Sequence, residues 1–192
     1  MARLLASVRA ALRAQSSLTL PQSEKTMSGH HPQFAQVHGA EPVPFAASGS
    51  QPGALAWALG VAGLIPFVLA AALQWFSPPG WRMLAASGLL TYGAVIVSFL
   101  GGIHWGLTMR SDAVSAARLV WGVAPSLLGW LAVLLDSPWG QIVLAASLIA
   151  CFLVDRLVYR GLGLAAWLPL RALLTSVAAL SSILSALAYW VA

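Results

Sequence analysis

Charged side chains are scarce in this sequence of 192 residues. They make up 8% of it, with 10 lysines and arginines against five acids. A typical soluble domain carries about 25% charged residues, and a water-soluble fold of this length has too few charges here to cover its surface. Hydrophobic residues make up 59% of the chain. The sequence therefore argues against an ordinary soluble domain and predicts a protein of the lipid bilayer.

Cysteine is almost absent as well, since Cys151 is the one cysteine in the chain. A disulfide framework and a cysteine-based metal site are therefore excluded, and a lone cysteine in an apolar run behaves as a small hydrophobic residue. The formal net charge is +5, but the arginines stand singly or in pairs beside apolar runs. They form no basic stripe that follows a phosphate backbone, so we expect no nucleic-acid partner.

The first 52 residues differ from the rest and are predicted to be an N-terminal tail. Three arginines precede the first acid, Glu24, and the apolar residues among them share one face of a helix. This pattern is typical of a mitochondrial transit peptide. Two alternatives stay open: Met27 is the true start, or residues 1–26 form a short helix on the membrane surface. Residues 27–52 are predicted to be a flexible linker, and their three histidines predict no metal site.

Residues 53–192 are predicted to form an all-α transmembrane domain, a bundle of five helices. Each predicted span is close to the 20 or so apolar residues that cross a bilayer, and short polar connections make neighbouring helices antiparallel. Pro66 and Pro125 fall within spans, where each is expected to kink its helix. The predicted spans are Gly53–Phe76, Trp81–Thr108, Arg118–Leu135, Trp139–Tyr159 and Trp167–Val191.

The distribution of basic residues predicts the orientation of these five spans. With five spans, the N-terminal tail shares a side with the second and fourth loops, and Arg82 is the one basic residue on the other side. Basic residues accumulate in loops on the inner side of a membrane. We therefore expect the N-terminus inside and the C-terminus outside, in a mitochondrial inner membrane or a bacterial cytoplasmic membrane.

The second predicted span carries small residues on one helical face. Small residues at this spacing let another helix approach closely within lipid. We interpret the face as a helix-packing surface; the alternative is a place where a ligand approaches the backbone. Its residues are Thr91, Ala94, Ser98, Gly102 and Gly106.

Five polar residues are predicted to lie at a similar depth near the inner boundary: His104, Asp155, Arg156, Arg171 and Arg118. Asp155 is expected to pair with one of the arginines or to orient His104. Such a cluster is suited to relaying protons or binding an anionic headgroup. The alternative is a set of arginines that only fix topology, with a histidine hydrogen-bonded near the headgroups.

Catalytic and cofactor patterns are missing from the sequence. It has no nucleophile beside a base, no phosphate-binding loop and no set of metal ligands, so we predict no catalytic residue and no metal. A bis-histidine haem needs two histidines within spans, and His104 is the one that qualifies. We therefore expect no bound cofactor.

Two strings and two shorter pairs carry a resemblance to a known family. The strings are Leu59–Phe67, LGVAGLIPF, and Tyr92–Gly106, YGAVIVSFLGGIHWG; the pairs are Pro125-Ser126 and Asp155-Arg156. Over residues 55–187 the chain resembles the domain of unknown function 3429 family. The resemblance implies a membrane-embedded, multi-helical protein of the kind found in bacteria and mitochondria, and it implies no particular activity.

These observations favour a non-enzymatic membrane protein. We expect an accessory subunit or assembly factor of a larger membrane complex, in contact with a membrane-protein partner or with further copies of itself. One alternative is a small transporter or channel that uses the inner-side polar cluster. The other is an enzyme that acts on a lipid or a quinone.

Overall fold

The computed structural model describes residues 51–110, 115–135 and 137–191. The predictions for residues 1–50 lie outside this part of the chain. The described residues form helices and no strand. In chain order the elements are α2 (Ala54–Ala62), α3 (Ile65–Phe76), α4 (Pro79–Met109), α5 (Ala116–Leu135), α6 (Ser137–Gly161), the short 3₁₀ turn η1 (Ala165–Trp167) and α7 (Leu168–Val191).

Within the described residues, five helical segments are long and apolar enough to cross a membrane. The predicted all-α bundle of five spans is therefore confirmed, while the inside and outside assignment of the termini stays a prediction. Each segment begins and ends within three residues of its predicted bounds: Ala54–Phe76, Pro79–Met109, Ala116–Leu135, Pro138–Gly161 and Ala165–Val191.

The first span is two helices, α2 and α3, rather than one. Pro66 lies in the first turn of α3, and its ring would clash with the carbonyl group of Ala62, four residues earlier, in a continuous helix. The backbone N–H of Leu64 instead donates to the carbonyl of Val61 at 3.0 Å. The hydroxyl of Tyr92 on α4 donates to the carbonyl of Gly63 at 2.9 Å. Pro66 therefore divides the first span into two helices, whereas the sequence predicted a kink within one helix.

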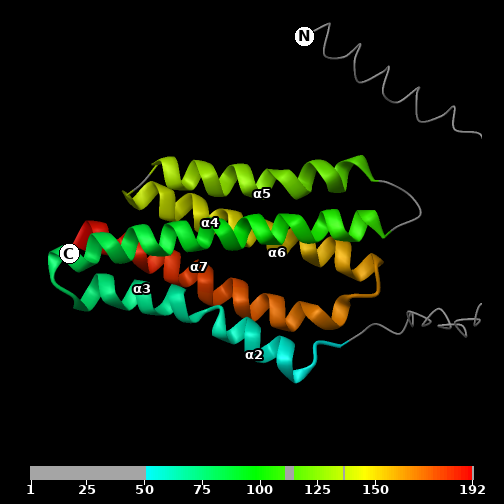
Figure 1. Ribbon diagram of the computed structural model, residues 1–192, viewed down its shortest axis with the longest axis horizontal. Coiled ribbons are helices and arrows are strands. Elements are labelled where there is room, and N and C mark those ends of the chain that lie inside the picture. Colours follow the sequence, from blue (N-terminus) through cyan, green and yellow to red (C-terminus); the bar gives the residue numbers. More distant parts are fainter. Residues whose placement is uncertain (1–50, 111–114, 136, 192) are drawn as a thin grey trace, which may run out of the picture. The chain divides into compact units, whose positions relative to one another are not determined.

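The central helix of the bundle is α4, which contacts α3, α5 and α6, whereas α7 packs on α6 and α3. Figure 1 shows α4, α6 and α7 between α5 and the α2–α3 pair. The ends of α4 and α6 and the starts of α5 and α7 meet at one end of the bundle (Figure 1). Four arginines lie there: Arg110, Arg118, Arg156 and Arg160. We call this the arginine end.

The surface of the bundle is apolar, as a lipid-facing surface requires. Buried residues such as Phe67, Val97 and Leu148 form the core between the helices. Large apolar side chains also cover the outside, among them Val95, Leu134 and Leu157. A soluble monomer seldom exposes large continuous apolar patches, whereas lipid tails solvate them without cost.

Helices α4 and α5 approach each other through glycines. A Cβ atom at Gly101 would clash with the backbone carbonyl of Gly122. A Cβ atom at Gly129 would come within 3.1 Å of the carbonyl oxygen of Ala94. In a bilayer, where apolar burial gives little driving force between helices, such close packing holds helices together.

Two adjacent glycines of α4 allow a matched test of this packing. Gly101→Ala forces the Cβ atom into the backbone of α5, so we expect a loss of about 1–3 kcal/mol in the free energy of unfolding. Gly102→Ala is the control, because within the described ranges nothing lies within 4 Å of a Cβ atom at Gly102. Thermal unfolding in detergent measures both variants. Equal melting temperatures would show that α5 does not pack on α4 through Gly101.

Candidate functional site

A buried carboxylate, Asp155 on α6, is the centre of the candidate site. Asp155 is 2% exposed. An ionised carboxylate at such a position is costly unless charges and hydrogen-bond donors surround it. Arg171 of α7 supplies both, because its Nε and Nη2 atoms donate to Asp155 Oδ2 at 2.8 and 2.5 Å. The ion pair therefore ties α6 to α7.

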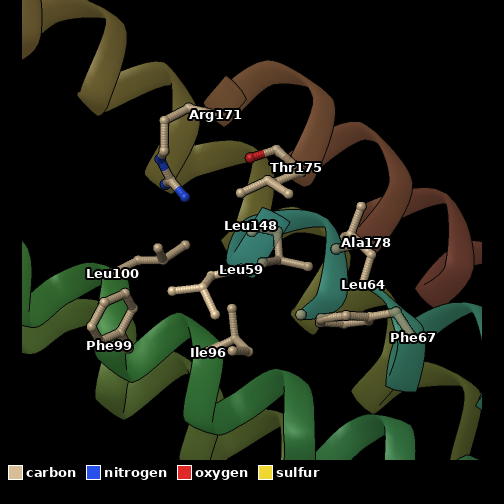
Figure 2. Close-up of a pocket in the computed structure, with 13 residues that line it drawn as sticks. Leu59, Leu64, Phe67, Ile96, Phe99, Leu100, Leu148, Arg171, Thr175 and Ala178 are labelled. Carbon is tan, nitrogen blue, oxygen red and sulfur yellow. The ribbon is translucent and has the colours of Figure 1, made fainter. Parts of the chain in front are cut away.

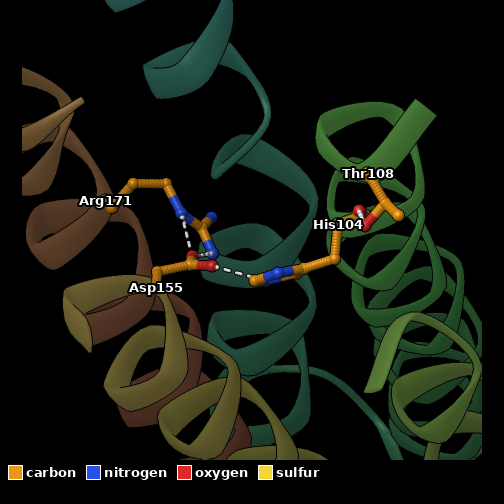
Figure 3. A network of polar contacts seen from close by, with 4 residues as sticks. All are labelled: His104, Thr108, Asp155 and Arg171. Atoms are coloured by element: carbon orange, nitrogen blue, oxygen red, sulfur yellow. Dashed lines mark hydrogen bonds and ion pairs between the residues drawn. The ribbon is translucent and has the colours of Figure 1, made fainter. Parts of the chain in front are cut away.

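The second oxygen of the same carboxylate contacts α4. His104 Nε2 lies 3.0 Å from Asp155 Oδ1, and His104 is 1% exposed. A carboxylate accepts hydrogen bonds, so this contact places the proton on Nε2. The hydroxyl of Thr108 donates to the carbonyl of His104 at 2.9 Å, one turn further along α4. Figure 3 shows Asp155 between Arg171 and His104, with dashed lines from its carboxylate to both side chains.

The three helices bring these side chains together through their packed faces. Val97, Gly101, His104 and Thr108 are all buried on α4, at the three- and four-residue spacing of one helical face. Arg171 lies in the first turn of α7, where a long side chain reaches back toward the end of α6. The site is thus built where α4, α6 and α7 meet, on the side of the arginine end.

Two of the five predicted cluster residues are not part of the site. Arg156 follows Asp155 directly, so it projects about 100° away around α6, and it is exposed. Arg118 is half-buried near the start of α5. Among the described residues, the ion-pair partners of Asp155 are His104 and Arg171.

The charges of the site form a buried ion pair between Asp155 and Arg171, which we call the closed pair. The two side chains carry opposite charges, and each balances the charge of the other. A buried pair of this kind adds little net stability, but removal of one partner leaves a charge without compensation. Among the described residues, no group of three His, Cys, Asp or Glu side chains is placed to hold a metal ion. Chemically, the arrangement holds a histidine and a guanidinium in fixed positions.

Two glutamines that sequence reasoning did not single out also link helices inside the bundle. Ser185 on α7 donates to Gln74 Oε1 on α3 at 2.8 Å. Gln141 on α6 donates from Nε2 to the carbonyl of Ala86 on α4 at 3.0 Å. Buried amides within spans were the available signal, because a polar group at that depth needs a partner.

The predicted small-residue face of α4 points away from the other described helices for most of its length. Thr91, Gly102 and Gly106 are exposed, and no described residue lies within 4 Å of a Cβ atom at either glycine, apart from the immediate helix backbone. Ala94 and Ser98 are half-buried, and Ala94 contacts Gly129 of α5. The intramolecular packing of α4 on α5 uses Gly101, one residue from the predicted Gly102. A packing role of the outer face stays a prediction.

An apolar pocket of about 290 Å³ adjoins the ion pair. Its walls come from α2, α3, α4 and α7, with Leu148 of α6 among the buried ones. Figure 2 shows Arg171 and Thr175 of α7 at one end of the pocket and apolar side chains around the remainder. Sequence reasoning missed this pocket, because it depends on the break between α2 and α3.

Comparison with known proteins identifies the family of this chain. Residues 53–187 match the family described as "Protein of unknown function (DUF3429)". The chain belongs to this family. The family match covers all five spans up to the last turn of α7, and it includes His104, Asp155 and Arg171.

A protein from Xenopus tropicalis, described as "Transmembrane protein 69", is 38% identical to this chain over 133 residues. The matched region covers 64% of this chain and 50% of the relative, so this chain spans about half the length of that protein. No solved structure matches the chain.

The closed-pair interpretation of the site predicts a specific pattern of stabilities. Asp155→Asn leaves Arg171 buried without its counter-charge, and we expect a loss of about 3–5 kcal/mol in the free energy of unfolding. The double variant Asp155→Asn/Arg171→Gln removes both charges and is expected to lose less than Asp155→Asn alone. Unfolding in detergent, followed by circular dichroism, measures both.

Arg156→Gln is the matched control for this cycle, because Arg156 is exposed and adjoins Asp155 in sequence. It is expected to unfold like the wild type. A double variant less stable than Asp155→Asn would contradict the closed pair, since additive losses mean that the two side chains do not compensate each other.

Proposed function

We propose that this chain is a non-enzymatic component of a larger membrane assembly, an accessory subunit or assembly factor that docks on a transmembrane helix of another protein. The membrane is a mitochondrial inner membrane or a bacterial cytoplasmic membrane, with the arginine end inside, as the excess of basic residues on that side favours. The docking surface is the outer face of α4 around Thr91, Gly102 and Gly106.

The observation that carries the proposal is the pair of open glycines, Gly102 and Gly106, on this face. Glycine within a helix costs about 1 kcal/mol relative to alanine. The contact between α4 and α5 requires glycine at Gly101 and Gly122, because a Cβ atom at either position would clash with the other helix. Among the residues that the structure describes, nothing comes within 4 Å of a Cβ atom placed at Gly102 or Gly106. A partner helix that approaches the backbone of α4 would require glycine at these two positions.

Charge favours a different protein over a second copy as the partner. Two copies in one membrane share an orientation, so a dimer through this face would bring their arginine ends side by side. Arg118, Arg156 and Arg160 give that end positive charge. Two such ends at close range repel each other. A partner with acidic residues at that level instead complements the arginine end.

The alternatives of transport and catalysis receive less support from the site. Asp155 already has a partner on each carboxylate oxygen, which favours a role in holding α4, α6 and α7 together. A protein that docks as a rigid unit needs such a cross-link, because its outer faces must keep their relative positions.

Native gel electrophoresis with mass spectrometry tests the docking proposal. Tagged protein is extracted from its own membranes in mild detergent, and we expect it to migrate with one larger complex in fixed stoichiometry. Gly106→Leu fills the open face and is expected to abolish that co-migration without lowering the melting temperature. Ala146→Leu is the control, because Ala146 is exposed on α6, away from this face.

Two outcomes would overturn the proposal. Migration as a monomer or as a homo-oligomer would remove the partner altogether. Co-migration that survives Gly106→Leu would move the contact to a different face of the bundle.

A further inference from the structure

The pocket beside Arg171 runs from the outer surface of the bundle into its core. Leu59 on α2 and Phe99 on α4 line it and are 64% and 66% exposed. Phe67, Leu148 and Ala178 line it as well and are buried. In a membrane the exposed end faces lipid, so a lipophilic molecule can enter sideways without crossing water.

Thr175, at the same end of the pocket as Arg171, has an unsatisfied hydroxyl. It is 5% exposed, and its Oγ1 has no hydrogen-bond partner among the described residues. Other helical hydroxyls of this chain bond to the carbonyl four residues earlier, as Thr91, Thr108 and Ser182 do. A buried hydroxyl left without a hydrogen bond costs about 1–3 kcal/mol. Because Thr175 lines the pocket, an atom of a bound ligand can form that hydrogen bond.

Arg171 has donors left over as well. Its Nε and Nη2 atoms bind Asp155, and no described residue accepts a hydrogen bond from Nη1. Figure 2 shows the guanidinium directed into the pocket, with the Thr175 oxygen turned toward the same space. Two groups able to donate hydrogen bonds therefore converge on one end of an otherwise apolar pocket, the arrangement that orients a small-molecule ligand.

We infer that this pocket binds a lipophilic molecule with a neutral carbonyl head, the oxygen accepting hydrogen bonds from Arg171 and Thr175. The charge of Arg171 is already balanced by Asp155, so an anionic head would bring an uncompensated charge into a buried site. A carbonyl accepts the same bonds without that cost. Two membrane sources share this chemistry, the ring of a quinone and the ester group of a lipid.

The geometry along α7 fits the orientation of such a molecule. Arg171 lies in the first turn of α7, on the side of the arginine end, and Ala178 lies seven residues further along the helix, roughly 10 Å along the axis. The apolar walls therefore extend from the head position toward the middle of the bilayer. A neighbouring hollow of about 330 Å³ shares Gly60, Phe99 and Arg171 with the pocket, which provides further room for a tail.

Helix α2 forms the cover over both hollows and is itself loosely held. It contains no buried residue, and Gly60 lies at the border of both hollows. The break before α3 separates α2 from the rest of the first span. The cover can thus adapt to a ligand without disturbing the core below it.

Photo-crosslinking of the full chain in phosphatidylcholine nanodiscs tests the inference. Three probes carry the same diazirine tail: a benzoquinone, a fatty-acid methyl ester and the free fatty acid. We expect one of the two neutral probes to label peptides of α2, α4 and α7 that line the pocket, and its excess unlabelled parent to compete. Labelling by the quinone or by the ester identifies the source of the carbonyl.

Two variants with matched controls link the labelling to the pocket. Thr175→Val removes the unsatisfied hydroxyl without a loss of volume and is expected to weaken binding about two- to ten-fold, the value of one neutral hydrogen bond. Its control is Ser176→Ala, which removes an exposed hydroxyl next to Thr175 on α7 that does not line the pocket. Gly60→Leu fills the pocket and is expected to abolish labelling. Its control is Ala58→Leu on the exposed side of α2.

The inference fails if none of the probes labels the lining peptides, or if Thr175→Val and Gly60→Leu label like the wild type. Preferential labelling by the free fatty acid would overturn the neutral head, because it would show that Arg171 accepts a second negative charge. The melting temperature of each variant in nanodiscs separates a lost ligand from a lost fold.

Discussion

A carboxylate buried where three helices meet is the constraint on which the rest of this structure depends. Asp155 cannot lie there alone, since an unpaired charge among apolar helices is prohibitively costly. It therefore fixes Arg171 of α7 on one oxygen and His104 of α4 on the other. Rotation of any of the three helices would break a bond in an environment where no water replaces it. These contacts of Asp155 thereby fix how α4, α6 and α7 are rotated about their own axes. The rotation in turn decides which residues of each helix face outward.

Glycine and proline determine the shape around that fixed centre. Gly101 and Gly122 let α4 and α5 approach until their backbones touch, so this side of the bundle is closed. Pro66 has the opposite effect on the other side, because it breaks the first span and leaves α2 as a short helix with no buried residue. The bundle is consequently tight at the α4–α5 contact and open under α2. The pocket lies on the open side because the close packing lies elsewhere.

The sequence predicts the five spans well, because the bilayer imposes their length and hydrophobicity on each segment separately. It also predicts that His104, Asp155 and Arg171 lie at one depth. It does not predict which arginine pairs with Asp155, since Arg156 and Arg171 share that depth and differ in rotation about their helices.

The same limit explains the difference between Gly101 and Gly102. Both satisfy a small-residue spacing, and the contact with Gly122 selects between them. A pocket that arises from a helix break and three neighbouring helices has no local sequence signal at all. Sequence patterns therefore predict how deep in the membrane a residue lies more readily than which neighbouring helix it faces.

The two proposed surfaces of this protein are adjacent, and their adjacency has a consequence. Phe99 lines the pocket and is largely exposed, and helical spacing places it on nearly the same side of α4 as Gly102 and Gly106. A partner helix on the glycine face would therefore lie next to Phe99, at the mouth of the pocket. Such a partner would narrow the path by which a lipophilic molecule enters from the bilayer. Docking and ligand binding would then be coupled, and each would change the affinity of the other by the same factor.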